Sequence, residues 1–342
     1  MKEKARILVI YTGGTIGMMV CPHSGALKPF NFEKMYEKLP MLKRFDHQID
    51  YHSFDPLIDS SDMNPDFWVK LASVIEDEYE NYDGFVILHG SDTMSYTASA
   101  LSFMLENLNK PVILTGSQLP IDAIRTDGRE NFLTAIEIAA ASEDKTPLVP
   151  EVSVYFENQL LRGNRTTKLN AENFNAFYSG NFPALANAGI YIKYSKSCIR
   201  KPNFKRLKVH KKLDTNVALL KLYPGMPKNF VKSVLETPGL KALILETFGS
   251  GNAPTEKWFI DLLQEASDRG LMIFNVTQCK AGTVQIGKYE ASVDMGKVGV
   301  IGGYDITTES ALAKLMYLLG LNLDKNEIKS YFQNSLRGEI TI

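Results

Sequence analysis

Uninterrupted apolar runs alternate along the chain with longer stretches in which apolar residues recur every three or four positions. The first half contains several such runs, which are typical of strands covered on both faces, at residues 7–11, 85–88, 112–114 and 152–156. The spacing between them predicts helices that each bury one stripe, over about 65–79, 94–108 and 129–141. The first half therefore predicts an alternation of strand and helix.

The second half repeats this alternation after a basic stretch. Strands are predicted at 217–222, 243–245, 272–276 and 298–301, and helices at 229–235, 255–267 and 309–319. This pattern favours an α/β fold of two domains with mainly parallel sheets, and 342 residues exceed a typical single core. We expect a larger N-terminal domain over 1–190, a linker over 191–212 and a smaller C-terminal domain over 213–342.

Composition narrows the class of protein. Hydrophobic residues make up 44% and charged residues 23% of the chain, as in an average globular protein. The formal net charge of −1 gives no electrostatic reason to expect nucleic acid or a membrane surface as partner. No segment reaches the roughly 18 apolar residues of a membrane span. The run at 7–11 is too short for a signal peptide, so we expect a cytoplasmic protein.

Cysteines and histidines give no sign of a bound metal. The three cysteines, at 21, 198 and 279, lie far apart and fit a reducing compartment better than a disulfide framework. The five histidines are isolated, without the spacing of zinc ligands. We expect neither a metal nor another cofactor.

Three of the predicted strands end in segments that combine glycine with hydroxyl residues. They are Thr12-Gly-Gly-Thr-Ile-Gly17, His89-Gly-Ser-Asp-Thr-Met94 and Thr115-Gly-Ser-Gln118. Glycine lets a backbone approach a ligand closely, although each segment alone could serve as an ordinary turn or helix cap. Ligands of open α/β sheets bind beyond the carboxyl ends of the strands. The three segments together therefore predict one pocket rich in hydroxyl and N–H groups.

Several kinds of chemistry compete for such a pocket. Phosphate binding is disfavoured because the chain has neither G-x-x-x-x-G-K-[ST] nor a G-x-G-x-x-G after a strand. A serine hydrolase of the Ser-His-Asp type would need a G-x-S-x-G elbow, and His89 at the end of a buried strand is more often structural. A threonine nucleophile is left. It needs a proton acceptor, which Asp92 and a lysine could provide.

The segments at 12–17 and 89–94 together resemble the paired signatures of bacterial-type L-asparaginases, most closely the cytoplasmic type I branch. The resemblance spans nearly the whole chain and continues through Asp59–Met63, Lys110–Gln118, Arg162–Lys168, Gly249–Pro254, Thr277–Cys279 and Gly302–Asp305. It implies an enzyme that hydrolyses L-asparagine to L-aspartate and ammonia, with glutamine as a poorer substrate. It also implies that no cofactor takes part and that the N-terminal domain is the catalytic one.

The resemblance assigns catalytic roles to particular residues. Thr15 matches the nucleophile that attacks the side-chain amide carbon and forms an acyl-enzyme intermediate. Ser91, Asp92 and Lys168 match a hydroxyl–carboxylate–lysine triad that assists proton transfer and deacylation by water.

Further residues match substrate-binding positions of the family. Asp92 is implied to hold the substrate ammonium, while Ser60 and Ser61 match positions that bind its α-carboxylate. Asn252 matches a residue that reaches the active site of a neighbouring subunit. The resemblance therefore implies a homodimer or a tetramer of dimers.

Three positions depart from the family pattern. Ser91 stands where threonine is usual, which keeps the hydroxyl but loses the methyl that stiffens χ1. The segment 18–30 is expected to be a mobile lid, with Ala26 where many relatives have a tyrosine, and we hypothesise that Tyr304 supplies a phenol instead. Glu246 stands where some relatives have an arginine of an allosteric asparagine site, and a carboxylate cannot replace that guanidinium.

Two other functions are alternatives. The asparaginase-like subunit of a tRNA-dependent amidotransferase resembles this fold but carries an additional N-terminal domain, whereas Thr15 lies almost at the start of this chain. An amino-acid-binding module would keep the pocket without turnover, but it would have no use for a nucleophile beside a lysine-assisted triad. Asparagine hydrolysis is the leading hypothesis.

Overall fold

The computed structural model describes residues 4–20, 27–29, 39–287 and 290–341 of the chain. These residues belong to two compact units, Met1–Lys211 and Lys212–Ile342. Each unit combines helices with a mainly parallel sheet, which confirms the predicted α/β fold class.

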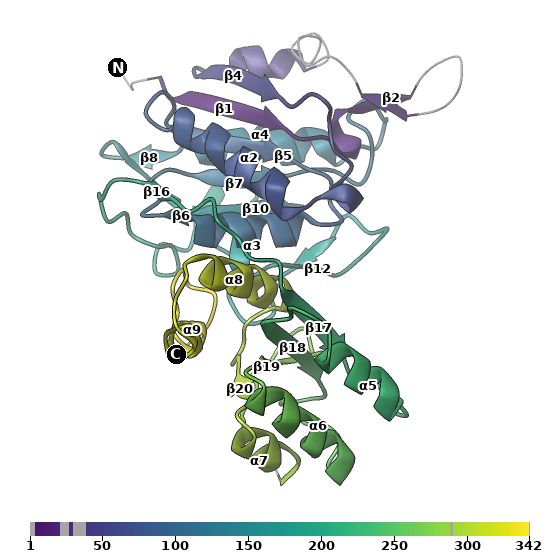
Figure 1. Ribbon diagram of the computed structural model, residues 1–342. Coiled ribbons are helices and arrows are strands. Elements are labelled where there is room, and N and C mark those ends of the chain that lie inside the picture. Colours follow the sequence, from purple (N-terminus) through teal and green to yellow (C-terminus); the bar gives the residue numbers. More distant parts are fainter. Residues whose placement is uncertain (1–3, 21–26, 30–38, 288–289, 342) are drawn as a thin grey trace. The chain divides into compact units, whose positions relative to one another are not determined.

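The first unit is built on an eight-stranded sheet with the order β15-β14-β11-β10-β7-β5-β1-β4 (Figure 1). Five neighbouring strands run parallel, namely β4, β1, β5, β7 and β10, and β11, β14 and β15 extend the sheet in antiparallel pairings. Their bounds are β1 (Arg6–Tyr11), β4 (Gln48–Ser53), β5 (Gly84–Leu88), β7 (Val112–Thr115), β10 (Val152–Phe156), β11 (Gln159–Arg162), β14 (Ala186–Ala188) and β15 (Ile192–Tyr194).

This strand order creates a switch point at β1. β1 pairs in parallel with β4 on one side and with β5 on the other. The chain therefore leaves β1 toward one edge of the sheet and later returns to build the remainder on the opposite side. From the carboxyl ends of β1 and β5 the chain continues to strands on opposite sides of β1, and such a switch point is where open α/β sheets bind ligands.

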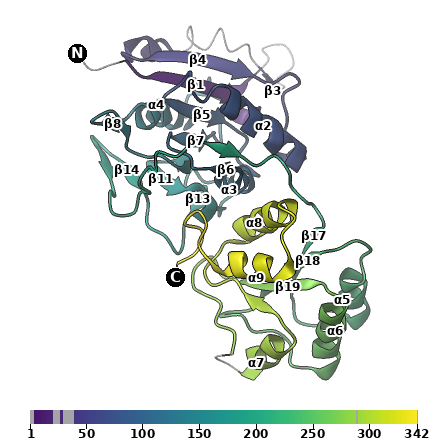
Figure 2. The same ribbon diagram turned by 60° about the vertical axis from the view of Figure 1, so that its left-hand side comes forward.

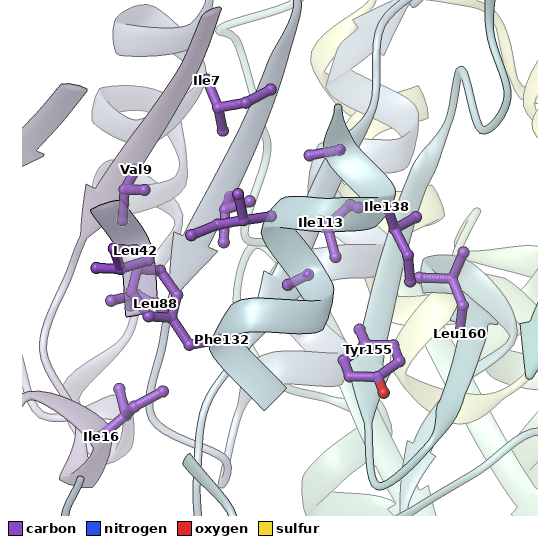
Figure 3. Close-up of a cluster of buried hydrophobic side chains, with 14 of the residues drawn as sticks. Ile7, Val9, Ile16, Leu42, Leu88, Ile113, Phe132, Ile138, Tyr155 and Leu160 are labelled. Carbon is purple, nitrogen blue, oxygen red and sulfur yellow. The ribbon is translucent and has the colours of Figure 1, made fainter. Parts of the chain in front are cut away.

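Helices cover both faces of the sheet. Helix α4 (Gly128–Ala139) packs on one face, where Phe132 joins Leu88 in a large buried cluster (Figure 3). Helices α2 (Pro65–Asp77) and α3 (Met94–Met104) lie on the other face. Because successive side chains of a strand point to opposite faces, the uninterrupted apolar runs supply both layers of this core.

The limits of the helices follow local sequence signals at α2 but not at α3. The Asn64 side chain accepts the N–H of Phe67 at 3.1 Å, which caps the start of α2 as its sequence indicates. Helix α3 ends at Met104 rather than near residue 108. The chain leaves the helix there because Leu105–Glu106 (β6) pairs antiparallel with Lys208–Val209 (β16).

The segment 191–212, expected to be a linker, contributes two strands to the first unit. β15 forms one edge of the eight-stranded sheet, and β16 pairs with β6. These strands are short and partly exposed, so the apolar pattern gives no signal for them. The first unit accordingly extends to Lys211.

Short antiparallel pairs complete the described part of the first unit. They are β2 (Met18–Val20) with β3 (Leu27–Pro29), β8 (Ser142–Glu143) with β9 (Thr146–Pro147), and β12 (Thr167–Lys168) with β13 (Phe177–Tyr178). β2 and β3 come from the segment that is expected to form the lid. Ala26, the residue singled out in that segment, lies outside the described residues.

The second unit is built on a four-stranded parallel sheet, β17 (Val217–Lys221), β18 (Ala242–Thr247), β19 (Met272–Thr277) and β20 (Ile301–Gly302) (Figure 2). Its helices are α5 (Lys228–Leu235), α6 (Lys257–Asp268), α7 (Glu290–Lys297), α8 (Thr308–Gly320) and α9 (Lys325–Gln333). The strand expected at 298–301 is thus shorter and begins later. Helices α7 and α9 were not predicted, and α9 is a short, polar helix that buries Ile328 and Phe332.

A fully buried ion pair anchors the end of the chain in the second unit. Lys314 of α8 donates to the Glu339 carboxylate and to the carbonyls of Phe332, at 2.9 Å, and Asn334, at 2.7 Å. Glu339 also accepts the N–H groups of Leu336 and Arg337. The polar atoms of the pair are therefore extensively hydrogen-bonded, as buried charges require.

Lys314→Met is expected to lower the free energy of unfolding of the second unit by about 3–5 kcal/mol, because it leaves the Glu339 carboxylate buried without its cation. The double variant K314M/E339L should recover a large part of that loss, since it removes both charges. Urea denaturation followed by circular dichroism measures both effects. A single variant within about 1 kcal/mol of the wild type would show that the pair does not stabilise this unit.

Candidate active site

The loops after β1 and β5 touch through two glycines. Gly14 has φ 90°, and a Cβ on it would lie 2.5 Å from the backbone nitrogen of Gly90. A Cβ on Gly90 would in turn lie 2.4 Å from Oγ of Ser60. Real Cβ atoms do not come so close to a backbone, so neither position accepts another residue without movement. Two of the segments predicted to form one pocket, at 12–17 and 89–94, therefore lie against each other, and the turn at Ser60 lies against the second of them.

Thr15 follows directly after the first of these glycines. Thr12 comes directly after β1. Its N–H and its hydroxyl both donate to the carbonyl of Leu88 at the end of β5. Gly14 then turns the chain, and Thr15 begins a short 3-10 helix, Thr15–Gly17. Thr15 is half-buried, while Thr12 is buried. Thr12 thus has a structural role in the loop, whereas Thr15 lies at the switch point.

Lys168 bonds to Ser91 and Asp92, two polar residues in the loop after β5. Its Nζ donates to Oγ of Ser91 at 2.8 Å and to Oδ1 of Asp92 at 2.7 Å. The Lys168 side chain is 18% exposed and that of Asp92 is 65% exposed, so one carboxylate face stays open to solvent. β12 and its antiparallel partner β13 bring Lys168 to this place from far along the sequence. The structure therefore assembles the predicted hydroxyl, carboxylate and lysine as one cluster.

Ser60 and Ser61 lie in a short 3-10 helix, Ser60–Asp62. The carbonyl of Ser60 accepts the hydroxyl of Thr93 at 2.6 Å, which ties this turn to the loop after β5. The N–H and the hydroxyl of Ser61 both donate to Asp59 at 2.8 Å. These two bonds hold the pKa of the Asp59 carboxyl below its usual range. Ser60 is buried, whereas Ser61 is exposed.

Several residues of the cluster received no role from the sequence. Thr93 and Asp59 hold the turn at Ser60, and Gln118 approaches Ser91 with its amide oxygen at 3.4 Å. Gln118 stands in one of the glycine-hydroxyl segments, so its place at the carboxyl end of β7 was a usable signal. Asp59 and Thr93 also stand in the recognised motifs. The contacts of Asp59 are local, with Ser61, whereas that of Thr93 joins two segments that meet only in space.

His89 has a structural environment, in agreement with its reading from the sequence. It is completely buried, with Nδ1 2.6 Å from the carbonyl of Gly90 and Nε2 2.9 Å from Oγ1 of Thr97. The carbonyl can only accept, so Nδ1 carries the proton and Nε2 accepts from the Thr97 hydroxyl. Burial lowers the pKa of His89 from 6.5 to about 4. The neutral imidazole of His89 thus holds Gly90 in the loop after β5.

Three other residues singled out in the sequence belong to the second unit. Tyr304 follows β20 with φ 55° and is 39% exposed. Asn252 donates its N–H to the carbonyl of Phe248 in the loop after β18. Glu246 is buried, where it pairs with Lys221 at 2.9 Å and accepts the Thr308 hydroxyl at 2.8 Å. Its carboxylate is thus already committed to donors of its own unit.

The described residues contain no group of three or more His, Cys, Asp or Glu side chains that could hold a metal ion. Within the same part of the chain, no helix is long and apolar enough to cross a membrane.

The fold and this cluster define an α/β protein with a hydroxyl–carboxylate–lysine site at the switch point of a parallel sheet. Residues 6–200 match the family described as "Asparaginase, N-terminal", and residues 216–332 match "Glutaminase/Asparaginase C-terminal domain". The chain belongs to the asparaginase family, which confirms the resemblance recognised in its motifs.

Individual relatives cover the whole chain. L-asparaginase 1 of Escherichia coli (strain K12) is 44% identical over 340 residues, which are 99% of each chain. The crystal structure of L-asparaginase I from Vibrio cholerae matches with a TM-score of 0.90 and 44% identity, over 99% of this chain and 100% of that one. The 60 kDa lysophospholipase of Mus musculus is 43% identical over 366 residues, and this chain covers 64% of its length.

The neutral state of His89 predicts a loss of stability in acid. The unfolded chain binds a proton at this imidazole near pH 6.5, whereas the folded chain does so only near pH 4. Between these values the unfolded state holds more protons, so the free energy of unfolding decreases as the pH falls. Lowering the pH from 7 to 5 is expected to cost about 2 kcal/mol through this residue.

His89→Gln should remove that part of the pH dependence, which urea denaturation at pH 7 and pH 5 measures. His52→Gln is the matched control, because His52 is exposed on β4 and the variant should keep the wild-type difference. If His89→Gln and the wild type lose the same free energy on acidification, the buried imidazole is not the cause.

Proposed function

We propose that the chain is an L-asparaginase that hydrolyses L-asparagine to L-aspartate and ammonia, with Thr15 as nucleophile. The observation that carries the proposal is the position of Lys168, bonded to both Ser91 and Asp92 beside the loop that presents Thr15. Membership of the asparaginase family and relatives named L-asparaginase support the same reaction.

The first half of the proposed reaction transfers the acyl group to Thr15. The Thr15 oxygen attacks the side-chain amide carbon of asparagine, the C–N bond breaks, and ammonia leaves with the proton that the hydroxyl gives up. The developing oxyanion needs fixed N–H donors. The backbone after β5 is suited to provide them, because α3 begins at Met94 and the first N–H groups of a helix have no partner within it.

The second half hydrolyses the ester of Thr15. Water attacks the acyl carbon, Thr15 leaves as an alcohol, and aspartate is released. Ser91, Asp92 and Lys168 are proposed to relay the proton that water loses. Their hydrogen bonds support this role, because a proton can pass along such a chain only when each donor contacts its acceptor.

The substrate is a zwitterion, and the cluster offers partners for both of its charges. Asp92 is proposed to bind the ammonium, and its 65% exposure leaves a carboxylate face available for it. Ser60 and Ser61 are proposed to bind the α-carboxylate. The Ser61 hydroxyl donates to Asp59, so it would have to turn away from Asp59 to reach the substrate.

Residues of the second unit extend the proposal. Asn252 is proposed to reach the active site of a neighbouring subunit, and the chain to assemble as a homodimer or tetramer in the cytoplasm. Tyr304 is proposed to supply the phenol that polarises Thr15. The family resemblance supports the role of Asn252 and the assembly. The role of Tyr304 rests on the absence of a tyrosine from the sequence 18–30 and on the exposure of the Tyr304 side chain. Glutamine is proposed as a poorer substrate, because an additional methylene changes the fit by about 1–3 kcal/mol.

Thr15→Ala is expected to lower kcat for ammonia release from L-asparagine by about a thousandfold or more, because the acyl-enzyme can no longer form. The assay follows ammonia from L-asparagine and from L-glutamine with purified protein. Thr237→Ala is the control, since Thr237 is an exposed threonine of the second unit. Wild-type turnover that persists in Thr15→Ala would exclude Thr15 as nucleophile, and no wild-type turnover of either amide would contradict the proposed activity.

Tyr304→Phe is expected to lower kcat by about a hundredfold, as the loss of a general acid or base does. Tyr331→Phe is a matched control from the same unit, because Tyr331 is 42% exposed and Tyr304 is 39% exposed. Steady-state kinetics with asparagine distinguish the two variants. Normal turnover by Tyr304→Phe would show that another group activates Thr15.

A further inference from the structure

Gln118 is held by hydrogen bonds on its backbone and on its amide nitrogen. Its N–H and that of Leu119 donate to the Asp127 carboxylate at 3.0 to 3.2 Å. Asn131 of α4 donates to the same carboxylate and to the carbonyl of Gly116. The loop after β7 is therefore clamped to the start of α4, so the Gln118 side chain projects from a fixed backbone.

The amide nitrogen of Gln118 is held by the segment that follows Lys168. It donates to the carbonyl of Ala171 at 3.1 Å and to that of Asn173 at 3.0 Å. Both carbonyls belong to the turn that connects β12, which carries Lys168, with β13. Because these two acceptors require N–H groups, they fix which end of the amide faces them, and the amide oxygen must point the other way.

The amide oxygen faces the hydroxyl of Ser91. That hydroxyl donates to Oε1 of Gln118 at 3.4 Å and accepts from Nζ of Lys168 at 2.8 Å. A serine hydroxyl rotates about χ1 and about its C–O bond, and hydrogen-bond partners select among the rotamers. With its proton directed to Gln118, Ser91 presents a lone pair to Lys168.

This contact matters more for serine than it would for threonine. A threonine at this position would carry a β-methyl that restricts χ1. Ser91 lacks that methyl, so its orientation depends on the groups that bond to its oxygen. We propose that Gln118 is a positioning residue that holds the Ser91 hydroxyl in the orientation facing Lys168 and so replaces the missing β-methyl.

The inference rests on the proposed function, in which Ser91 and Lys168 pass a proton. It predicts that Gln118→Leu lowers kcat by about three- to tenfold, the effect of one neutral hydrogen bond, with a smaller change in KM. The 3.4 Å contact is long for a hydroxyl donor, which favours the lower part of that range. Leucine has a similar size and leaves the backbone bonds to Asp127 in place.

The decisive comparison introduces a β-methyl at residue 91 with the S91T variant. In the presence of S91T, the loss caused by Q118L should shrink to within about twofold, because threonine restricts its own χ1. Four proteins are compared for ammonia release: wild type, Q118L, S91T and S91T/Q118L. A purely structural role of Gln118 in the β12–β13 turn would give the same loss with and without S91T, and that result would overturn the proposal, as would normal turnover by Q118L.

Gln278→Leu is the matched control. Gln278 also donates its amide N–H groups to two carbonyls, of Leu222 at 2.6 Å and Glu246 at 2.8 Å, but it does so in the second unit. Any effect of Q278L on kcat should be the same with and without S91T. Rescue of Q278L by S91T would mean that threonine improves turnover generally, and this would also overturn the proposal.

Crystal structures separate this inference from the proposed function. At high resolution, Ser91 should occupy one χ1 rotamer in the wild type and more than one in Q118L, whereas S91T/Q118L should again show one. A single, unchanged Ser91 rotamer in Q118L would overturn the positioning role, even if the wild type proves inactive on both amides. Inactivity of the wild type alone would contradict the proposed function and leave the rotamer comparison to decide the role of Gln118.

Discussion

The close approach of Gly14 to Gly90 is the constraint on which the rest of the site depends. The two residues follow neighbouring strands at the switch point of the sheet, and a Cβ on either would meet backbone or side-chain atoms within 2.5 Å. Because Gly14 has no Cβ, the loop after β1 can lie against Gly90, and because Gly90 has none, the turn at Ser60 can lie against the loop after β5. Their contact places Thr15 next to the loop of Ser91 and Asp92, and the buried, neutral His89 holds that loop from below. The proposed nucleophile and its proposed proton relay thus come together through backbone packing, which rigid strands determine more closely than side-chain contacts do.

Charge is distributed unevenly in this cluster, and the distribution suits a zwitterionic ligand. Lys168 is mostly covered, whereas most of the Asp92 side chain is in contact with solvent. Their attraction is therefore screened and contributes little to stability. It does orient Lys168, which bonds at the same time to a neutral hydroxyl. The exposed carboxylate can bind a substrate ammonium without giving up its lysine, because a carboxylate has more acceptor sites than this one bond uses.

The apolar pattern predicted the parts of the fold that are buried on both faces. β1, β5, β7 and β10 lie where uninterrupted runs occur, because such runs reflect burial directly. β4 was missed because it is an edge strand with polar, partly exposed residues. β15 and β16 were missed for the same reason, which made a segment of the first unit look like a linker. The motifs identified the residues of the cluster, but the hydrogen bonds of Thr93 and Gln118 could not be predicted, since they join segments far apart in the sequence.

Serine and threonine at residue 91 would control the orientation of the hydroxyl in two different ways. A β-branched side chain carries its restriction in its own covalent structure, and neighbours need only leave room for the methyl. The orientation of a serine hydroxyl depends instead on the groups that bond to it, and these groups must then be rigid themselves. Here the acceptor for the Ser91 hydroxyl is an amide held at both ends, by the Asp127 carboxylate on its backbone and by two carbonyls on its nitrogen. Because Ser91 has no β-methyl, the geometry of the cluster depends on the turn between β12 and β13. The same turn follows Lys168, so one segment of the chain positions both partners of the proposed proton transfer.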